Sequence, residues 1–414
     1  MNKRALIIAY HFPPQAASSG IQRTLSFSKY LGRHGWDALV LSAHPIAYAA
    51  KNPSQLASVP SSLVVRRPFA LDAKRHLGLF GRYPDILALP DRWSSWWLTA
   101  VPAGLSLIRK HRPEIIWSTF PIATSHLIGL TLHRLTGIPW VADFRDPMLQ
   151  DGYPATPMQR KAFAWIERQA VTRCCKAVFT THSALHAYRQ RFAHLPQEKF
   201  TVIENGYDEE GFLGSEMLAP VRAGGQKVRL LHSGVLYAQG RNPSAFFDAI
   251  ARLKATGRVN ADALSVILRA TGDDPYFNAM VQKYGVQDIV RIEPPVPYRE
   301  ALREMLDVDG LLVFQGTPFN TQVPAKIYEY FRARRPIFGL VDPAGETARI
   351  LSAAGFTDVA SMDSPEAICQ ALDKFLREIQ QGNAYCASDA VVTASSREHR
   401  TRELANLFNQ VALA

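Results

Sequence analysis

The chain has 414 residues, of which 47% are hydrophobic and 20% are charged. This length exceeds the size at which one hydrophobic core normally divides, so two domains are expected. The composition is that of a globular protein, and no uncharged apolar run reaches the length of a membrane-spanning helix. The four cysteines lack the spacing of metal ligands, and their sparse use fits a reducing cytoplasm.

The formal net charge of +11 at pH 7 indicates an anionic partner. Nucleic acid is one candidate, but the chain has no helix-turn-helix, RNA-binding aromatic motif or lysine-rich arm. An anionic membrane surface combined with a diphosphate ligand explains the charge about as well. We therefore expect no nucleic acid partner, although the charge alone does not decide the matter.

The first half of the chain alternates short apolar runs with helical patterns, which predicts parallel α/β layers. The amino-terminal apolar run is too short for the core of a signal peptide and is predicted to be the first strand. The expected strands cover residues 5–9, 38–41, 63–65, 115–118, 140–143, 177–180 and 200–203. The clearest helices between them cover residues 21–33, 123–135 and 159–171.

The second half repeats this alternation after a polar, glycine-containing stretch that is expected to be a linker. The expected strands cover residues 228–231, 266–269, 290–292, 311–314 and 337–341. The expected helices cover residues 245–255, 298–306, 325–334 and 365–380. An amphipathic stretch at residues 396–411 follows with no strand after it.

The loop after the first strand ends at Gly20, where the absence of a side chain lets a ligand approach a helix start closely. The alternative is an ordinary strand-to-helix turn.

Further along, Trp93, Trp96 and Trp97 have helical spacing beside basic residues, a pattern typical of a membrane interface or a lipid-linked ligand. A helix buried on the domain explains the same spacing.

Asp143 and Asp146 lie at the end of the fifth expected strand, on either side of Arg145. Two carboxylates around an arginine can orient a hydroxyl group and share its proton. His126, at the start of a neighbouring helix, is a second candidate for this role. The structural alternatives are that Asp143 caps a helix and pairs with Arg145, and that His126 is a core or capping residue.

The turn after the first strand of the second half contains Gly234 and Arg241. Gly234 permits close approach of a ligand, and Arg241 can hold phosphate oxygens through two parallel hydrogen bonds. A solvated arginine on a loop is the alternative.

Asp307 and Asp309 formally match a metal-binding Asp-x-Asp motif, but they fall at a helix end, where capping and surface roles are expected.

The segment Val-Pro-Ala-Lys-Ile-Tyr-Glu-Tyr-Phe at residues 323–331 narrows the function most. Pro324 suits a first helical turn, because its missing N–H is not needed there. Lys326, Glu329 and Tyr330 then share one helix face. A helix that begins at the carboxyl end of a buried strand directs its positive pole at an anion. Such a site suits a sugar attached to a diphosphate.

This segment resembles the donor-binding helix of the retaining, nucleotide-sugar-dependent glycosyltransferases of family 4. Glu329 matches the second residue of the family's Glu-x7-Glu pair, whereas Thr321 occupies the first position, as in a branch with a Pro-x-Lys-x-x-Glu-Tyr pattern. The resemblance implies the α/β GT-B fold, in which two Rossmann-like domains face each other across a cleft and a C-terminal helix crosses back. The domains implied are an acceptor-binding domain at 1–206, a linker at 207–227, a donor-binding domain at 228–395 and the terminal helix at 396–414.

The resemblance also implies roles for single residues. Donor phosphates would lie at Gly20, with Arg23 nearby, and at Gly234, Arg241 and Lys326, while Glu329 would hold hydroxyl groups of the donor. The backbone near Val296 and Tyr298 would frame the base. The residues Glu204-Asn205-Gly206-Tyr207-Asp208 resemble the family's turn at the end of the first domain. Much of the family has a histidine where this chain has Arg145, so Asp143 or Asp146 is expected to be the acceptor-side base.

The implied function is transfer of a hexose from a nucleotide-diphosphate sugar to a glycan or lipid-linked acceptor in cell-surface polysaccharide synthesis. No tightly bound cofactor and no metal are expected, because the donor is a co-substrate. The enzyme would be cytoplasmic, or peripheral on the inner face of the membrane. The alternatives are a nucleotide-sugar epimerase or hydrolase of the same fold, and an inactive sugar-nucleotide-binding protein.

Overall fold

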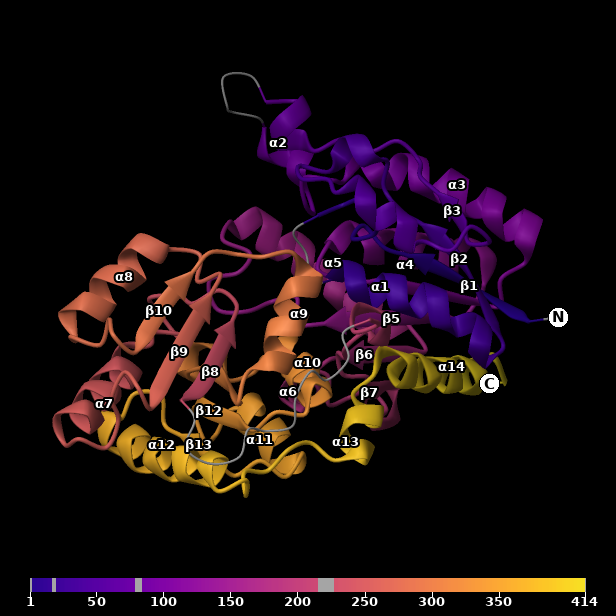
Figure 1. Cartoon of the computed structure of the whole chain (residues 1–414). Helices are drawn as coiled ribbons and strands as arrows, with labels where there is room; N and C mark the ends of the chain where they lie inside the picture. The colour runs from indigo at the N-terminus through magenta and orange to yellow at the C-terminus, as the bar shows by residue number, and fades with distance from the viewer. Residues whose placement is uncertain (1, 17–19, 79–83, 215–226, 414) are drawn as a thin grey trace. The chain divides into compact units, whose positions relative to one another are not determined.

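The structure is a computed structural model that describes residues 2–16, 20–78, 84–214 and 227–413. It contains two compact units (Figure 1). Unit 1 comprises Met1–Asn205 and Arg397–Ala414, and unit 2 comprises Gly206–Ser396. Each unit is built on one parallel sheet with helices packed against it, so the predicted α/β class with two Rossmann-like domains is confirmed. Most of the expected linker, residues 215–226, lies outside the described residues.

Within the described residues, the sheet of unit 1 has seven strands in the order β3-β2-β1-β4-β5-β6-β7. Their residues are apolar on both faces because helices cover the sheet on both sides. For this reason, each strand of unit 1 could be predicted from a continuous apolar run in the sequence. The strands are β1 (Lys3–Ile8), β2 (Trp36–Leu41), β3 (Val64–Arg66), β4 (Ile115–Thr119), β5 (Trp140–Arg145), β6 (Lys176–Phe179) and β7 (Phe200–Val202).

The α-helices of unit 1 are α1 (Gly20–Tyr30), α2 (Ala73–His76), α3 (Ser95–His111), α4 (Ala123–Thr136), α5 (Pro157–Arg173), α6 (His182–Arg191) and α14 (Arg397–Leu413). Short 3-10 helices are η1 (Leu31–His34), η2 (Pro45–Ala47), η3 (Pro53–Ser58), η4 (Asp85–Ala88) and η5 (Gln197–Lys199). The terminal helix α14 returns to unit 1, as predicted, and buries Leu404 and Phe408. Asn409 Oδ1 accepts a hydrogen bond from Trp36 Nε1 at 3.1 Å, and the Phe408 ring contacts the Trp36 ring edge to face.

The sheet of unit 2 has six strands within the described residues, in the order β10-β9-β8-β11-β12-β13. The strands are β8 (Val228–Ser233), β9 (Leu264–Arg269), β10 (Val290–Glu293), β11 (Gly310–Gln315), β12 (Ile337–Val341) and β13 (Val359–Ala360). The five predicted strands are present. The sequence did not predict β13, because a two-residue strand is too short to leave a pattern.

The α-helices of unit 2 are α7 (Ser244–Ala255), α8 (Asp274–Lys283), α9 (Tyr298–Asp307), α10 (Lys326–Ala333), α11 (Glu346–Ala353), α12 (Pro365–Gln380) and α13 (Asp389–Ala394). Short 3-10 helices are η6 (Glu209–Gly211) and η7 (Thr317–Phe319). Helix α10 begins at Lys326 rather than at Pro324. The N–H of Ile327 donates to the Pro324 carbonyl at 3.1 Å, so a tight three-residue turn precedes the first α-helical residue.

The three tryptophans of the α3 region belong to the core of unit 1. Trp96 is fully buried, and Trp93 and Trp97 are partly buried against the same cluster. Trp97 Nε1 donates to Thr131 Oγ1 at 2.9 Å, and the Arg92 guanidinium lies over the Trp93 ring. The buried alternative therefore holds for this pattern. Among the described residues, no helix combines the length and the apolar character needed to cross a bilayer.

Candidate functional site

The order of the strands in unit 2 reverses between β8 and β11, the place where ligands bind in open parallel sheets. Gly234 follows β8, and Lys326 begins α10 after β11. A Cβ atom built on Gly234 would lie 3.3 Å from Cε and 3.4 Å from Cδ of Lys326. The lysine side chain thus passes directly over the glycine, and a side chain at position 234 would crowd it. The structure brings these two predicted residues together.

Arg241 lies beside the same turn and is held in a fixed orientation. Its Nε donates to Gln315 Oε1 at 2.8 Å, and its guanidinium lies over the rings of Tyr237 and Phe319 at 5.4 and 5.2 Å. The two terminal nitrogens have no hydrogen-bond partner within the described residues. Burial lowers the pKa of Arg241 from its usual value. The guanidinium is therefore positioned by the protein, while two of its three nitrogens can donate to a ligand.

Glu329 lies one turn beyond Lys326 on α10. Its Oε2 is 4.0 Å from Lys326 Nζ and has no hydrogen-bond partner among the described residues. Its Oε1 accepts a hydrogen bond from the hydroxyl of Tyr298, at the start of α9, at 2.8 Å. The sequence pointed to the backbone around Val296 and Tyr298, and the structure adds a role for the Tyr298 side chain. That phenol fixes one oxygen of Glu329 and leaves the other for a ligand.

Tyr330 is a structural residue, although its spacing places it near Lys326 and Glu329. It is buried, and its hydroxyl accepts a hydrogen bond from the Ser233 N–H at 3.1 Å.

Sequence reasoning missed His232, which lies on β8 two residues before Gly234. Burial lowers the pKa of its imidazole, and the positive charges of Lys326 and Arg241 lower it further. A histidine in an apolar strand was the available signal.

In unit 1, Asp143 forms a buried ion pair with Arg23 of α1. Nε and Nη2 of Arg23 donate to the two carboxylate oxygens at 3.0 and 2.9 Å, and Thr119 Oγ1 adds a third bond at 2.9 Å. Arg23 also donates to the carbonyls of Ile203 and Glu204 at 3.0 Å. Arg23 is therefore a buried link between α1, β5 and the end of β7, rather than a free phosphate ligand. Asp143 pairs with Arg23, not with Arg145.

Asp146 is placed differently, because β5 ends in a bulge. The register shifts between Asp143 and Arg145, and Arg145 adopts a left-handed conformation with φ of 60°. Such a conformation is costly for a residue with a side chain and is often found at functional sites. Burial raises the pKa of Asp146, while the neighbouring Arg145 opposes that shift. The Asp146 carboxylate makes no hydrogen bond within the described residues, so it is free to accept one from a ligand.

His126 lies in the core of unit 1. Its Nδ1 is 2.8 Å from Ser118 Oγ, which also accepts a hydrogen bond from Trp140 Nε1. Burial lowers the pKa of His126 to about 3, and the ring of Phe144 lies 4.8 Å away.

Gly20 is buried at the first position of α1. The preceding part of its predicted loop, residues 17–19, lies outside the described residues.

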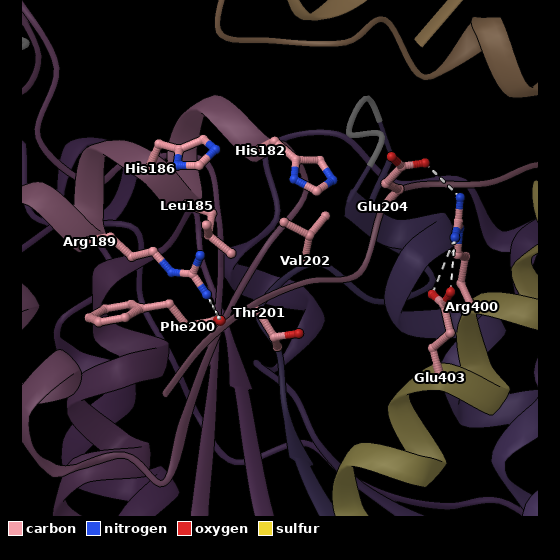
Figure 2. Close-up of a pocket in the computed structure, with 10 residues that line it drawn as sticks. All are labelled: His182, Leu185, His186, Arg189, Phe200, Thr201, Val202, Glu204, Arg400 and Glu403. Carbon is pink, nitrogen blue, oxygen red and sulfur yellow. Dashed lines mark hydrogen bonds and ion pairs between the residues drawn. The ribbon is translucent and has the colours of Figure 1, made fainter. Parts of the chain in front are cut away.

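Unit 1 also contains a pocket of about 510 Å³ beside β7, the last strand of its sheet. Figure 2 shows His182, His186 and Arg189 on one side of it and Glu204, Arg400 and Glu403 on the other. Leu185, Phe200, Thr201 and Val202 complete the lining.

The charged groups of this pocket balance one another. Arg400 pairs with Glu204 at 2.6 Å and with Glu403 at 3.1 Å, and Arg189 Nη2 donates to the Phe200 carbonyl. Within the described part of the chain, the imidazoles of His182 and His186 make no hydrogen bond or ion pair. Because Glu204 is also bound through its carbonyl by Arg23, the pocket wall is joined to the Asp143 cluster.

The aspartates of the Asp-x-Asp motif bind protein groups. Asp309 accepts a hydrogen bond from the Arg229 N–H at 2.8 Å, and Asp307 forms an ion pair with the Arg229 side chain. The two aspartates therefore bind the backbone and side chain of β8. The described residues contain no group of three His, Cys, Asp or Glu side chains that could hold a metal ion.

Residues 19–206 match the family model described as a glycosyl transferase 4-like domain. Residues 19–206 thus form a domain of this glycosyltransferase family. The match covers nearly all of the amino-terminal segment of unit 1, including Asp143, Asp146 and much of the pocket. The family was predicted from the α10 segment of unit 2. The matching residues 19–206 lie almost entirely in unit 1, and they confirm that prediction independently. No curated protein matches the sequence.

Solved structures share the fold of this chain along nearly its whole length. Anabaena HepE in complex with UDP has a TM-score of 0.64 at 12% identity, covering 99% of this chain and 100% of that one. Sucrose-phosphate synthase from Thermosynechococcus elongatus has a TM-score of 0.59 at 12% identity, covering 100% and 97%. WaaG, a glycosyltransferase involved in lipopolysaccharide biosynthesis, has a TM-score of 0.55 at 14% identity, covering 99% and 98%. At these identities the likeness establishes the GT-B fold.

Proposed function

We propose that the protein transfers a sugar from a nucleotide-diphosphate donor to a glycan or lipid-linked acceptor, with retention at the anomeric carbon. The observation that carries the proposal is the pair of cations around Gly234. Lys326 crosses the glycine, and Arg241 presents two nitrogens without a partner in the described residues. A diphosphate supplies the negative charge and the acceptor oxygens that both groups require. The solved structures of HepE with UDP and with UDP-glucose support a donor of this class.

The remaining groups of unit 2 suit the rest of the donor. Glu329 Oε2 would accept hydrogen bonds from ribose or sugar hydroxyls, with its orientation fixed by the Tyr298 phenol. The backbone near Val296 would frame the base. Because Lys326 and Arg241 would supply two positive charges to the diphosphate, we expect that no metal ion is required to bind it.

In the reaction, the bond between the anomeric carbon and the β-phosphate oxygen breaks, and its electron pair stays on the phosphate. The acceptor oxygen then bonds to the anomeric carbon through an oxocarbenium-like transition state. The departing phosphate takes the acceptor proton on the same face of the sugar. Lys326 and Arg241 stabilise the charge that develops on this leaving group, so they bind the transition state more tightly than the ground state.

Unit 1 would supply the acceptor side. Among Asp143, Asp146 and His126, the geometry favours Asp146, because its carboxylate is free whereas Asp143 is bound by Arg23 and His126 is enclosed in the core. Asp146 would orient the attacking hydroxyl. The pocket beside β7 suits a glycan, since its paired charges and free imidazoles can donate to and accept from hydroxyls without imposing a net charge. This glycan would belong to a cell-surface polysaccharide or glycoconjugate.

A peripheral membrane position is supported by an exposed surface around α2, η4 and α3. Here called the apolar surface, it consists of Phe69, Leu77, Ile86, Leu87 and Leu98, each at least 42% exposed. Hydrogen bonds from Ser94 to the Leu87 carbonyl and from Thr99 to the Phe69 carbonyl join these segments. Lys74 and Arg75 are exposed residues of α2, the helix that precedes Leu77 in the chain. This surface, rather than the tryptophans, would contact an anionic leaflet.

The experiment that tests the donor site is replacement of Lys326. We expect Lys326→Ala to lower the transfer rate by about 10²–10³, because a fixed group that stabilises developing charge is lost. Folding should be unaffected, since the lysine makes only a 4.0 Å ion pair. Lys283→Ala, which removes an exposed lysine of α8, is the matched control. The rate is measured with a panel of nucleotide sugars after thermal-shift screening of nucleoside diphosphates, which must stabilise a protein that binds them.

Several outcomes would contradict the proposal. Wild-type turnover in Lys326→Ala would show that the lysine is a surface residue. Epimerised or hydrolysed nucleotide sugar without transfer would favour the epimerase or hydrolase alternative. The absence of stabilisation by any nucleoside diphosphate at millimolar concentration would overturn the donor site, whereas stabilisation without any turnover would favour the inactive sugar-nucleotide-binding protein.

A further inference from the structure

His232 presents a buried hydrogen-bond acceptor that no described residue fills. It is 8% exposed, and its Nδ1 lies 2.9 Å from the Leu312 carbonyl oxygen of the adjacent strand β11. A carbonyl oxygen can only accept, so Nδ1 carries the proton and donates it. Nε2 is therefore left with a lone pair in the neutral imidazole.

The surroundings of His232 keep the ring neutral. Burial is the main cause, and together with Lys326 and Arg241 it lowers the pKa of His232 to about 4, against the smaller opposing effect of the Leu312 and Gly234 backbone. The ring also meets Phe314 edge to face at 5.1 Å, which fixes its plane. At neutral pH, Nε2 can thus accept a hydrogen bond but cannot donate one.

The position of Nε2 shows where its partner must come from. The atom is buried without a hydrogen-bond partner among the described residues. It lies 3.7 Å from the point that a Cβ of Gly234 would occupy, the same point that lies 3.3 Å from Lys326 Cε. Nε2 therefore lies beside Gly234 and next to the Lys326 side chain, so a ligand that draws this lysine toward its phosphates would lie next to the lone pair. An unpaired buried acceptor is unfavourable, so a ligand that donates a hydrogen bond there gains affinity.

We propose that His232 Nε2 accepts a hydrogen bond from a hydroxyl group of the nucleotide sugar, on the ribose or on the transferred sugar, beside the diphosphate. The inference rests on the donor site proposed above. Ionised phosphate oxygens carry no proton and cannot fill this acceptor. A hydroxyl group can, and it would then lie between the neutral imidazole and the cations that hold the phosphates. His232 is thus a specificity residue that detects one hydroxyl of the donor.

Two variants separate this role from a structural one. His232→Asn places an amide nitrogen near the position of Nδ1, which keeps the bond to Leu312 and removes Nε2. His232→Gln loses the Leu312 bond and places an amide oxygen near the position of Nε2, so it restores the acceptor. Isothermal titration calorimetry measures the Kd of each variant for the nucleoside diphosphate that stabilises the wild type, and for the matching nucleotide sugar.

We expect His232→Asn to weaken binding about 3- to 10-fold, as loss of one buried hydrogen bond does, and His232→Gln to recover part of it. If both ligands weaken equally, the hydroxyl belongs to the ribose. If only the nucleotide sugar weakens, it belongs to the transferred sugar. Donors that lack a single hydroxyl supply an independent measurement on the unmodified protein, where one deletion should weaken binding by the same factor.

Wild-type affinity of His232→Asn for both ligands would overturn the inference and leave the donor site standing. The inference also fails if no single-hydroxyl deletion weakens binding to the wild type, whether or not the variants fold. If the wild type binds no nucleoside diphosphate at all, the proposed function itself fails. The two failures are therefore distinguishable.

Discussion

Asp143 and Asp146 are three residues apart, yet the structure gives their carboxylates opposite environments. Both carboxylate oxygens of Asp143 accept hydrogen bonds from the protein, and Arg23 supplies two of these bonds as a bidentate pair. The carboxylate of Asp146 lies beyond the β5 bulge, next to Arg145. A buried ion pair contributes little net stability, but removal of one partner leaves an uncompensated charge. The two residues can therefore be separated by experiment.

We predict that Asp143→Asn lowers the free energy of unfolding of unit 1 by about 3–5 kcal/mol, because the buried guanidinium of Arg23 loses its counter-charge. Asp146→Asn should leave stability nearly unchanged and reduce kcat for transfer. Urea denaturation and initial-rate measurements on the same preparations check both variants. An Asp143→Asn enzyme with wild-type stability and reduced kcat would instead make Asp143 the catalytic carboxylate.

The sequence identified most of the donor-site residues because their chemistry is local. The spacing of Lys326 and Glu329 on one helix, and a glycine after a strand, are visible in the chain itself. The pairing of Arg23 with Asp143 was not visible, since the two residues are separated by many intervening elements and meet only when the sheet forms. His232 was missed for the same reason: its unfilled Nε2 becomes apparent only once β11 places a carbonyl against Nδ1.

At the scale of elements, β7 is short and lies at the end of the sheet, with α6 and α14 beside it lining the pocket. His182 and His186 are four residues apart on α6, so both imidazoles project from one helix face. The clearest predicted helices did not include α6, which spans ten residues, whereas α14 was predicted from its amphipathic spacing. Element length limits such predictions: α14 spans 17 residues, whereas β13 spans two.

We predict that the double variant His182→Ala with His186→Ala raises KM for a glycan acceptor about 10-fold, because each imidazole contributes roughly one hydrogen bond to hydroxyls. The Kd for the donor should not change, since Lys326, Arg241 and Glu329 of the proposed donor site lie in unit 2. His194→Ala, an exposed histidine just after α6, is the matched control. A change in donor Kd, or an unchanged acceptor KM, would remove the pocket from the acceptor site.

At the scale of the whole molecule, each unit completes its own sheet and core, and the chain returns to unit 1 only through α14. The net charge of +11 belongs to the molecule as a whole. A charge of this sign draws a protein to an anionic surface through long-range attraction, which salt screens, whereas apolar contacts are short-ranged and insensitive to moderate salt. The apolar surface includes Leu77, which directly follows the α2 segment that carries the exposed Lys74 and Arg75, so both kinds of contact are available there.

We predict that the protein binds vesicles containing anionic phospholipid more tightly than neutral ones, and that raising the salt concentration from about 0.05 to about 0.5 M weakens this binding, because the Debye length shortens from roughly 14 to roughly 4 Å. Ile86→Ser with Leu98→Ser should reduce the bound fraction further at any salt concentration, since two exposed apolar side chains leave the interface. Leu135→Ser, which changes a leucine of similar exposure on α4, is the control. Co-sedimentation measures all three. Equal binding to neutral and anionic vesicles would show that the charge serves the diphosphate ligand alone. An unaffected double variant would show that the apolar surface has another partner.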